Sequence, residues 1–223
     1  MLEIACFNAA SAIAAALAGA DRIELCADYS AGGVTPSLST LHAVRSKTDK
    51  PINVMIRPRG GDFNYSAAEL SQVKSSIETF KASGMVNGFV FGVLDAADRV
   101  DVEKNRELIG LAAPLPCTFH RAIDGVEDIC AAVEMIIDLG FRNILTSGGA
   151  SNATSGADEV AGLQKKYGQR ISLILGGGIR SANVQELKRR TGVEWMHSAA
   201  ITSGDETVDE EEVKKMIALL QDA

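Results

Sequence analysis

The stretch that decides the fold is "CTFHRAIDGVEDICAAVEMIIDLGFRNILTS", residues 117–147. It begins with a short apolar run at 117–121 and ends with another at 143–147, each of the length of a buried strand. Between them, apolar residues recur at helical spacing from Val126 to Leu139, which gives a helix one apolar face. Strand, helix and strand in this order form the unit from which parallel sheets are built.

The same unit recurs along the whole chain. Strands are predicted at 2–7, 22–26, 52–56, 88–93, 117–121, 143–147, 171–175 and 194–198. Helices are predicted at 9–17, 38–44, 67–82, 102–112, 126–139, 157–167, 183–190 and 209–220, with Asn8 and Asn183 as candidate caps of the first and seventh. Eight such units predict an α/β fold, a single (β/α)8 barrel of TIM type over residues 1–223. The alternative is an open flavodoxin-like sheet, which usually needs fewer strands.

Net charge and the lengths of the apolar runs exclude two classes of binding partner, nucleic acids and membranes. The formal charge of −7 argues against a nucleic-acid partner, because phosphate backbones are bound by basic stripes that this chain lacks. No apolar run approaches the roughly 18 residues of a membrane span. The alanine-rich segment 9–20 has no basic lead, so we read it as a helix rather than a signal peptide. We therefore expect a cytoplasmic protein without a membrane partner. The four cysteines are too few and too scattered for a disulfide framework.

Polar residues gather at the predicted strand ends. In such barrels the active site lies at the carboxyl ends of the strands. Side chains alternate along a strand, and this alternation predicts five candidate catalytic side chains in the interior: Glu3, Glu24, Arg57, His120 and His197. Acids, an arginine and histidines at that end favour acid–base chemistry. The alternative is a polar core in which Arg57 neutralises Glu3 or Glu24.

Glycine-rich loops suggest an anion site. "TSGGAS" (146–151) follows the sixth strand and "LGGGIRSAN" (175–183) follows the seventh, where many barrels of this type hold phosphate. A tight turn is the alternative. The candidate anion-binding residues are Arg59, Arg121, Ser147, Gly148, Gly149, Gly176, Gly177 and Gly178. Of the two arginines in "MIRPRGG", we expect Arg57 to set the charge of the site and Arg59 to meet the ligand. The lysines lie away from the strand ends, which argues against a Schiff base.

The segments "GADRIELCAD", "VMIRPRGGDFNYS", "GFVFGVL", "FHRAID" and "ILTSGG" resemble, in order and spacing, those of the CutC family, often called copper homeostasis proteins. The resemblance covers nearly the whole chain. It implies a TIM-like barrel, a cytoplasmic homo-oligomer and a role in Cu(I) binding. Of the two thiols proposed for copper in the family, the second falls on Cys26 and the first on Ala5. The neighbouring Cys6 replaces it only if the strand bulges, because alternation turns Cys6 outward.

Two hypotheses follow. In the first, the protein binds Cu(I), chiefly through Cys26, with Cys6 as a weaker candidate ligand. In the second, it is an enzyme for a small anionic metabolite such as a phosphorylated one, with His120 as general acid or base and a glutamate beside it. A further alternative is that Glu24, His120 and His197 hold a hard divalent ion.

Overall fold

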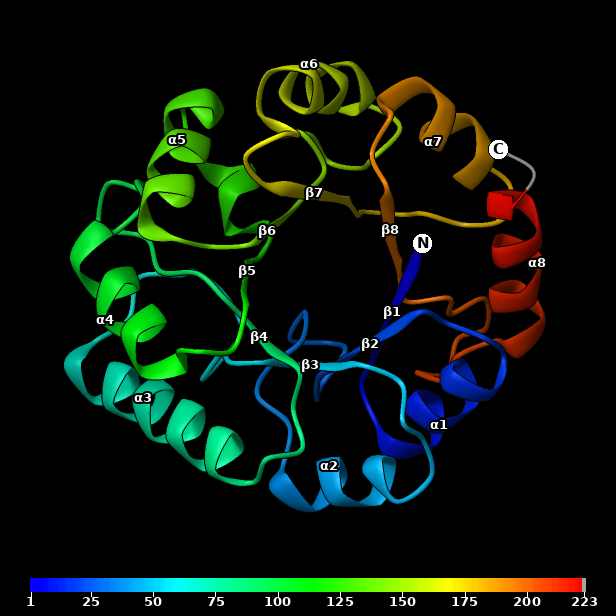
Figure 1. The fold of residues 1–223 in the computed structure, drawn as a ribbon, viewed down its shortest axis with the longest axis horizontal. Helices are drawn as coiled ribbons and strands as arrows, with labels where there is room; N and C mark the ends of the chain where they lie inside the picture. Colours follow the sequence, from blue (N-terminus) through cyan, green and yellow to red (C-terminus); the bar gives the residue numbers. More distant parts are fainter. Residues whose placement is uncertain (222–223) are drawn as a thin grey trace.

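The computed structural model describes residues 1–221 as a closed barrel of parallel strands in the order β1 to β8, with helices outside (Figure 1). The strands are β1 Leu2–Cys6, β2 Arg22–Leu25, β3 Ile52–Met55, β4 Gly88–Phe91, β5 Cys117–Phe119, β6 Asn143–Thr146, β7 Ser172–Leu175 and β8 Trp195–Ser198. The helices are α1 Ala9–Leu17, α2 Leu38–Arg45, α3 Ala67–Ala82, α4 Val102–Ala112, α5 Ile129–Leu139, α6 Ala157–Tyr167, α7 Val184–Thr191 and α8 Glu210–Gln221. The predicted (β/α)8 barrel is confirmed.

The segment after β5 differs most from its predicted bounds. The strand stops at Phe119, and a 3₁₀ helix, η1, covers Arg121–Gly125. Helix α5 then begins at Ile129 rather than Val126, because the Asp128 carboxylate accepts the Ala131 N–H and caps it. His120 therefore lies beyond the end of the strand and begins a loop at the mouth of the barrel.

The two predicted asparagine caps have different outcomes. The Asn8 side chain accepts the Ser11 N–H and caps α1, as predicted. Asn183 precedes α7 but makes no capping bond there. Its Oδ1 instead accepts the Arg180 N–H and its Nδ2 donates to the Gly178 carbonyl, so it stabilises the glycine loop rather than the helix.

Strand register brings the polar interior residues to the same levels of the barrel. Glu3 of β1 lies opposite His197 of β8, and Ala5 lies opposite Glu24 of β2. Outward residues such as Ile4 and Ile23 are fully buried in the main apolar core, which the helices cover. No helix within residues 1–221 combines the length and apolar character needed to cross a membrane.

Candidate functional site

A cavity of about 340 Å³ lies at the carboxyl ends of the strands. The sequence-based candidates that line it are Glu24, Cys26, Arg57, His120, Arg121, Gly177, Gly178 and His197. Those that are not part of its wall are Glu3, Cys6, Arg59, Ser147, Gly148, Gly149 and Gly176. The wall also includes residues that the sequence did not single out, among them Tyr29, Met55, Phe63 and Arg180.

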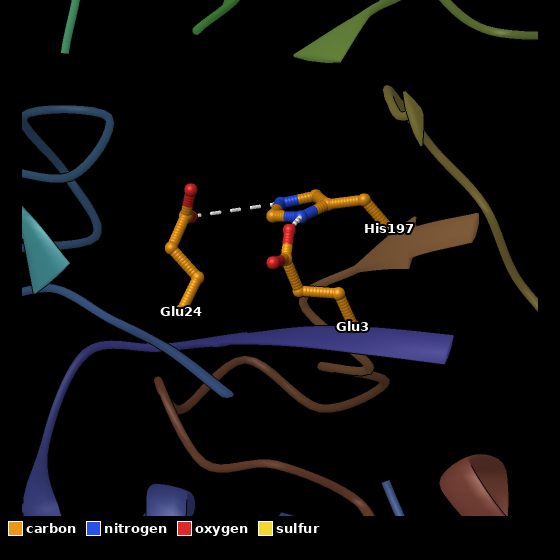
Figure 2. Close-up of side chains that lie close together, drawn as sticks. All are labelled: Glu3, Glu24 and His197. Atoms are coloured by element: carbon orange, nitrogen blue, oxygen red, sulfur yellow. Dashed lines mark hydrogen bonds and ion pairs between the residues drawn. The ribbon is translucent and has the colours of Figure 1, made fainter. Parts of the chain in front are cut away.

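Glu3 forms the floor of the polar interior. Its side chain is 1% exposed and is held by two cations. Arg22 Nε lies 2.5 Å from one carboxylate oxygen, and His197 Nδ1 lies 2.7 Å from the other (Figure 2). The Arg22 guanidinium also stacks on Trp195, 3.8 Å from the ring centre. Burial alone would raise the pKa of Glu3, but the bonds and charges of His197 and Arg22 hold that pKa below its usual value.

Glu24 lies above this floor, on β2. One of its oxygens, Oε2, is 3.7 Å from His197 Nε2 and accepts a 3.5 Å hydrogen bond from the Cys26 thiol. The other, Oε1, is buried and has no hydrogen-bond partner among the described residues. Burial raises the pKa of Glu24. In Figure 2 the His197 ring lies between the two carboxylates.

The surroundings of His197 favour its positively charged form. Burial alone would lower its pKa, but Glu24 and the hydrogen-bonded Glu3 outweigh burial and raise it above the ordinary histidine value. The ring is fixed at Nδ1 by Glu3, so its Nε2 side faces Glu24.

Arg57 does not neutralise either glutamate, contrary to the polar-core alternative. Its guanidinium donates to the backbone carbonyls of Ala31, Gly33 and Gly61, at 3.1, 3.3 and 2.6 Å. The residue is 6% exposed, its Nε is buried without a partner, and within residues 1–221 no carboxylate lies at ion-pair distance. A buried cation in the cavity wall is thus left without a counter-charge.

His120 is buried in the cavity wall. Its Nδ1 accepts the Ala122 N–H at 3.4 Å, and its Nε2 is buried without a partner among the described residues. Burial and the neighbouring Arg57 charge lower the pKa of His120 to about 3. The ring is therefore neutral, and because Nδ1 is an acceptor, the single N–H stands on Nε2.

The expectation that Arg59 meets a ligand is not supported by its position. Its Nε lies 2.6 Å from Glu69, and its Nη2 lies 2.9 Å from Asp62. The guanidinium also donates to the Gly60, Asp62 and Asn64 carbonyls. Glu69 is at the same time the capping-box residue of α3. Arg59 thus fastens the loop after β3 to the start of α3, outside the cavity wall.

The glycine loop after β6 is not a free anion site, because an internal carboxylate already fills it. Asp124 accepts the N–H groups of Ser147 and Gly149 at 3.0 and 3.2 Å and the Thr146 hydroxyl at 2.5 Å. Arg121 completes the arrangement, with Nε 2.7 Å from Asp124 and Nη2 2.7 Å from the Ser147 hydroxyl. The sequence did not single out Asp124, because it shows this residue in "FHRAID" after the fifth strand and carries no signal for its contact with the loop after the sixth.

The loop after β7 is different. Gly177 and Gly178 line the cavity with φ of +105° and +81°, a conformation that favours glycine. Gly176 lies behind them, where an added Cβ would stand 2.7 Å from Leu145. Arg180, which the sequence did not single out, lines the same wall. It donates to the Ile179 and Ile201 carbonyls and to the Ser198 hydroxyl.

The thiols occupy two separate environments. Cys26 lines the cavity and packs with Met55, Val90 and Phe7 in a small apolar cluster. Cys6 belongs to the main core on the helix side, and its thiol donates to the Ile4 carbonyl. No bulge turns Cys6 inward, so the structure contradicts its assignment to a shared site with Cys26. Burial and the charge of Glu24 raise the pKa of both thiols well above the usual value.

A divalent cation has a candidate site only at Glu3, Glu24 and His197, whose ligand atoms lie within 4.8 Å of one another in the described chain. His120, expected in this group, is not part of it. The residues present fit poorly, because Arg22 and His197 already occupy both carboxylate oxygens of Glu3. The arrangement stands instead as a fixed ion-pair network beneath a polar cavity.

Comparison with known proteins agrees with the barrel. The sequence pattern of the CutC family matches residues 1–202. A copper homeostasis protein cutC homolog from Homo sapiens is 40% identical over 205 residues, 92% of this chain and 75% of that protein. A CutC protein from Xanthomonas campestris is 42% identical over 199 residues, 89% of this chain and 82% of that one. The solved structure of CutC from Streptococcus agalactiae superposes with a TM-score of 0.82 at 28% identity, covering 89% of this chain and 98% of that one. This chain therefore belongs to the CutC family.

Proposed function

We propose that this protein takes part in copper homeostasis and holds Cu(I) at Cys26. Relatives at about 40% identity carry copper homeostasis in their names, which supports the role. The supporting observation in this chain is the pairing of two soft donors. Cys26 and Met55 belong to the same small apolar cluster at the cavity wall. Cu(I) prefers thiolate and thioether ligands, which these two side chains offer. The same resemblance supports a cytoplasmic homo-oligomer.

This ligand set differs from the two-thiol pattern that the family resemblance implies. Ala5 stands where the first thiol is expected, and Cys6 faces the helices. Met55 on the neighbouring strand takes its place as second sulfur donor. Because the Cys26 thiol is protonated at neutral pH, Cu(I) must displace a proton, and affinity should rise with pH.

Anaerobic titration with Cu(I) against a chromogenic chelator tests the copper proposal. Cys26→Ser should weaken Cu(I) binding by at least about a hundredfold and Met55→Leu by about tenfold. Cys117→Ser, at a buried thiol outside the cavity, is the matched control. Unchanged affinity in Cys26→Ser would eliminate this site.

A specific observation favours a second function, an enzyme that acts on a small organic anion. Arg57 is buried in the cavity wall with no carboxylate partner in the described chain. Burying an uncompensated charge is costly, so a guanidinium in this position favours an anionic ligand. Copper binding does not explain the Arg57 guanidinium, because a positively charged side chain repels a copper cation.

Calorimetric titration with small carboxylates and phosphates tests the second function. Binding should be lost in Arg57→Gln and retained in Arg106→Gln, which changes an exposed arginine on α4 in the same way. Arg57→Lys keeps the charge but not the planar fork, so it should weaken binding without abolishing it. Equal affinities in all four proteins would exclude Arg57 as the anion-binding group.

A further inference from the structure

Three polar side-chain atoms in the cavity wall are buried and without a hydrogen-bond partner among the described residues. They are Oε1 of Glu24, Nε of Arg57 and Nε2 of His120. Their residues are 3%, 6% and 3% exposed, and all three line the same cavity. Proteins rarely leave buried polar groups unpaired, and such groups concentrate where a ligand completes them.

The three atoms offer different chemistry from three strand ends. Arg57 follows β3 and offers a charged donor, and His120 follows β5 and offers a neutral N–H donor. Glu24 lies on β2 and offers a carboxylate acceptor. A ligand that satisfies all three has an anionic group, an oxygen that accepts a hydrogen bond, and a proton to give.

Neutral His120 is suited to stabilise a developing oxyanion. Its Nδ1 is occupied by the Ala122 N–H, which fixes the tautomer with the proton on Nε2. Gly92 makes room for the ring, since an added Cβ there would lie 2.9 Å from His120 Nδ1. Phe63 packs on the ring with centroids 4.7 Å apart. The donor is therefore held in place before any ligand enters.

Glu24 is suited to accept a proton. Its Oε2 is held by the Cys26 thiol and faces charged His197, which leaves Oε1 as the free basic atom. Glu3 fixes His197 from the opposite side of the ring. Glu3 thus holds His197, and His197 positions the base.

We propose that this cavity catalyses proton transfer at the carbon next to a carbonyl group in a small hydroxy-carbonyl anion, with Glu24 as base and His120 as oxyanion donor. The inference rests on the second proposed function, because Arg57 must hold the carboxylate or phosphate of that substrate. It extends that function from binding to a reaction class, isomerisation.

The step balances without a cofactor or redox partner. Glu24 Oε1 takes the proton from the carbon beside the carbonyl, and the C–H electron pair forms a carbon–carbon double bond. The carbonyl π electrons move to oxygen, where the His120 Nε2–H stabilises the enolate. The proton then returns from Glu24 to the adjacent carbon, the former carbonyl carbon, and the hydroxyl proton moves to the enolate oxygen, which completes the isomerisation. Return to the first carbon regenerates the substrate and, in deuterated water, exchanges its proton.

Proton exchange in deuterated water tests the reaction before the natural substrate is known. The probes are hydroxypyruvate, dihydroxyacetone phosphate and ribulose 5-phosphate, followed by proton NMR for loss of the signal beside the carbonyl. Exchange with at least one probe should exceed the protein-free rate. It should fall at least a hundredfold in Glu24→Gln and at least tenfold in His120→Gln. His42→Gln, at an exposed histidine on α2, should leave the rate unchanged.

The same samples separate failure of the reaction from failure of the site. A probe that binds through Arg57 in calorimetry but shows no exchange overturns the proton-transfer inference and leaves anion binding intact. Absence of binding by all three probes counts against both proposals. His197→Gln should lower the exchange rate about tenfold and leave the calorimetric affinity for the probe unchanged, because His197 acts through Glu24. An equal fall in rate and in affinity would contradict that positioning role.

Discussion

Replacing His120 with glutamine is expected to reduce the loss of unfolding free energy at acidic pH, because part of that loss comes from this one side chain. Burial and the Arg57 charge lower the pKa of His120 from 6.5 to about 3. At about pH 5 the unfolded chain protonates this histidine while the folded protein keeps it neutral. Because the folded-state pKa is depressed, the stability contribution is complete above pH 6.5 and is lost as the pH falls toward 3.

The size of this loss follows from the interval of pH. One pKa unit corresponds to about 1.36 kcal/mol. Between the unfolded pKa of 6.5 and about pH 5, His120 should therefore cost about 2 kcal/mol of unfolding free energy. Urea unfolding at about pH 8 and about pH 5 measures it. The stability lost on acidification should be about 2 kcal/mol smaller in His120→Gln than in the wild type, with His42→Gln controlling for the substitution at a surface site.

His197 provides the opposite sign in the same assay. Burial alone would lower its pKa, but Glu24 and Glu3 raise it, so its stabilisation is complete below 6.5 and is lost as the pH rises through the folded-state value. His197→Gln should therefore lose more stability on acidification than the wild type, whereas His120→Gln loses less. If both variants followed the wild-type pH dependence, the assignment of a neutral and a charged histidine to the cavity would be wrong.

Four other predictions concern the loops, helix α6 and the thiol. Asp124→Ala should lower the unfolding free energy by about 3 kcal/mol or more, measured by urea unfolding, because it leaves buried donors of the loop after β6 without an acceptor. Gly156→Ala should destabilise by about 2 kcal/mol or more, since the new Cβ would lie on the Ser147 carbonyl oxygen. Gly162→Ala on α6 meets open space and should instead raise the unfolding free energy by up to about 1 kcal/mol, again measured by urea unfolding. Iodoacetamide at neutral pH should modify Cys26 more slowly than half-buried Cys130, as read by peptide mass spectrometry, because burial and Glu24 raise the pKa of the Cys26 thiol.

The barrel was predictable because each strand–helix unit is encoded locally. Alternation also places Glu3, Glu24 and Cys26 correctly, since a regular strand allows only two faces. The prediction weakens where the backbone leaves the strand. The start of α5 moved from Val126 to Ile129 because the short helix η1 intervenes, and periodicity carries no signal for it.

Partner choice within the site could not be predicted, because it depends on distances between distant segments. Arg22, at the start of β2, reaches Glu3, while Arg57 turns to backbone carbonyls of the loop after β2. Arg59 was predicted to bind a ligand, but its guanidinium forms ion pairs with Asp62 and Glu69 instead. Residue type and the alternation of side chains along a strand therefore predict where a residue lies. They do not predict which charged groups pair with one another.

The polar interior consists of two layers that differ in how their charges are paired. In the lower layer, Arg22 and His197 bind Glu3, and His197 also lies 3.7 Å from Glu24, so two cationic side chains face two carboxylates within the protein. In the upper layer, Arg57 and His120 each keep a buried donor atom without an acceptor. Arg22 Nη2 in the lower layer is also buried without a hydrogen-bond partner, but its guanidinium lies beside a carboxylate, whereas that of Arg57 has none among the described residues. A polar core kept only for stability would give Arg57 a counter-charge as well, because an unpaired buried charge costs more than a pair gains. The buried charge of Arg57 is therefore the feature on which the proposed anion site rests.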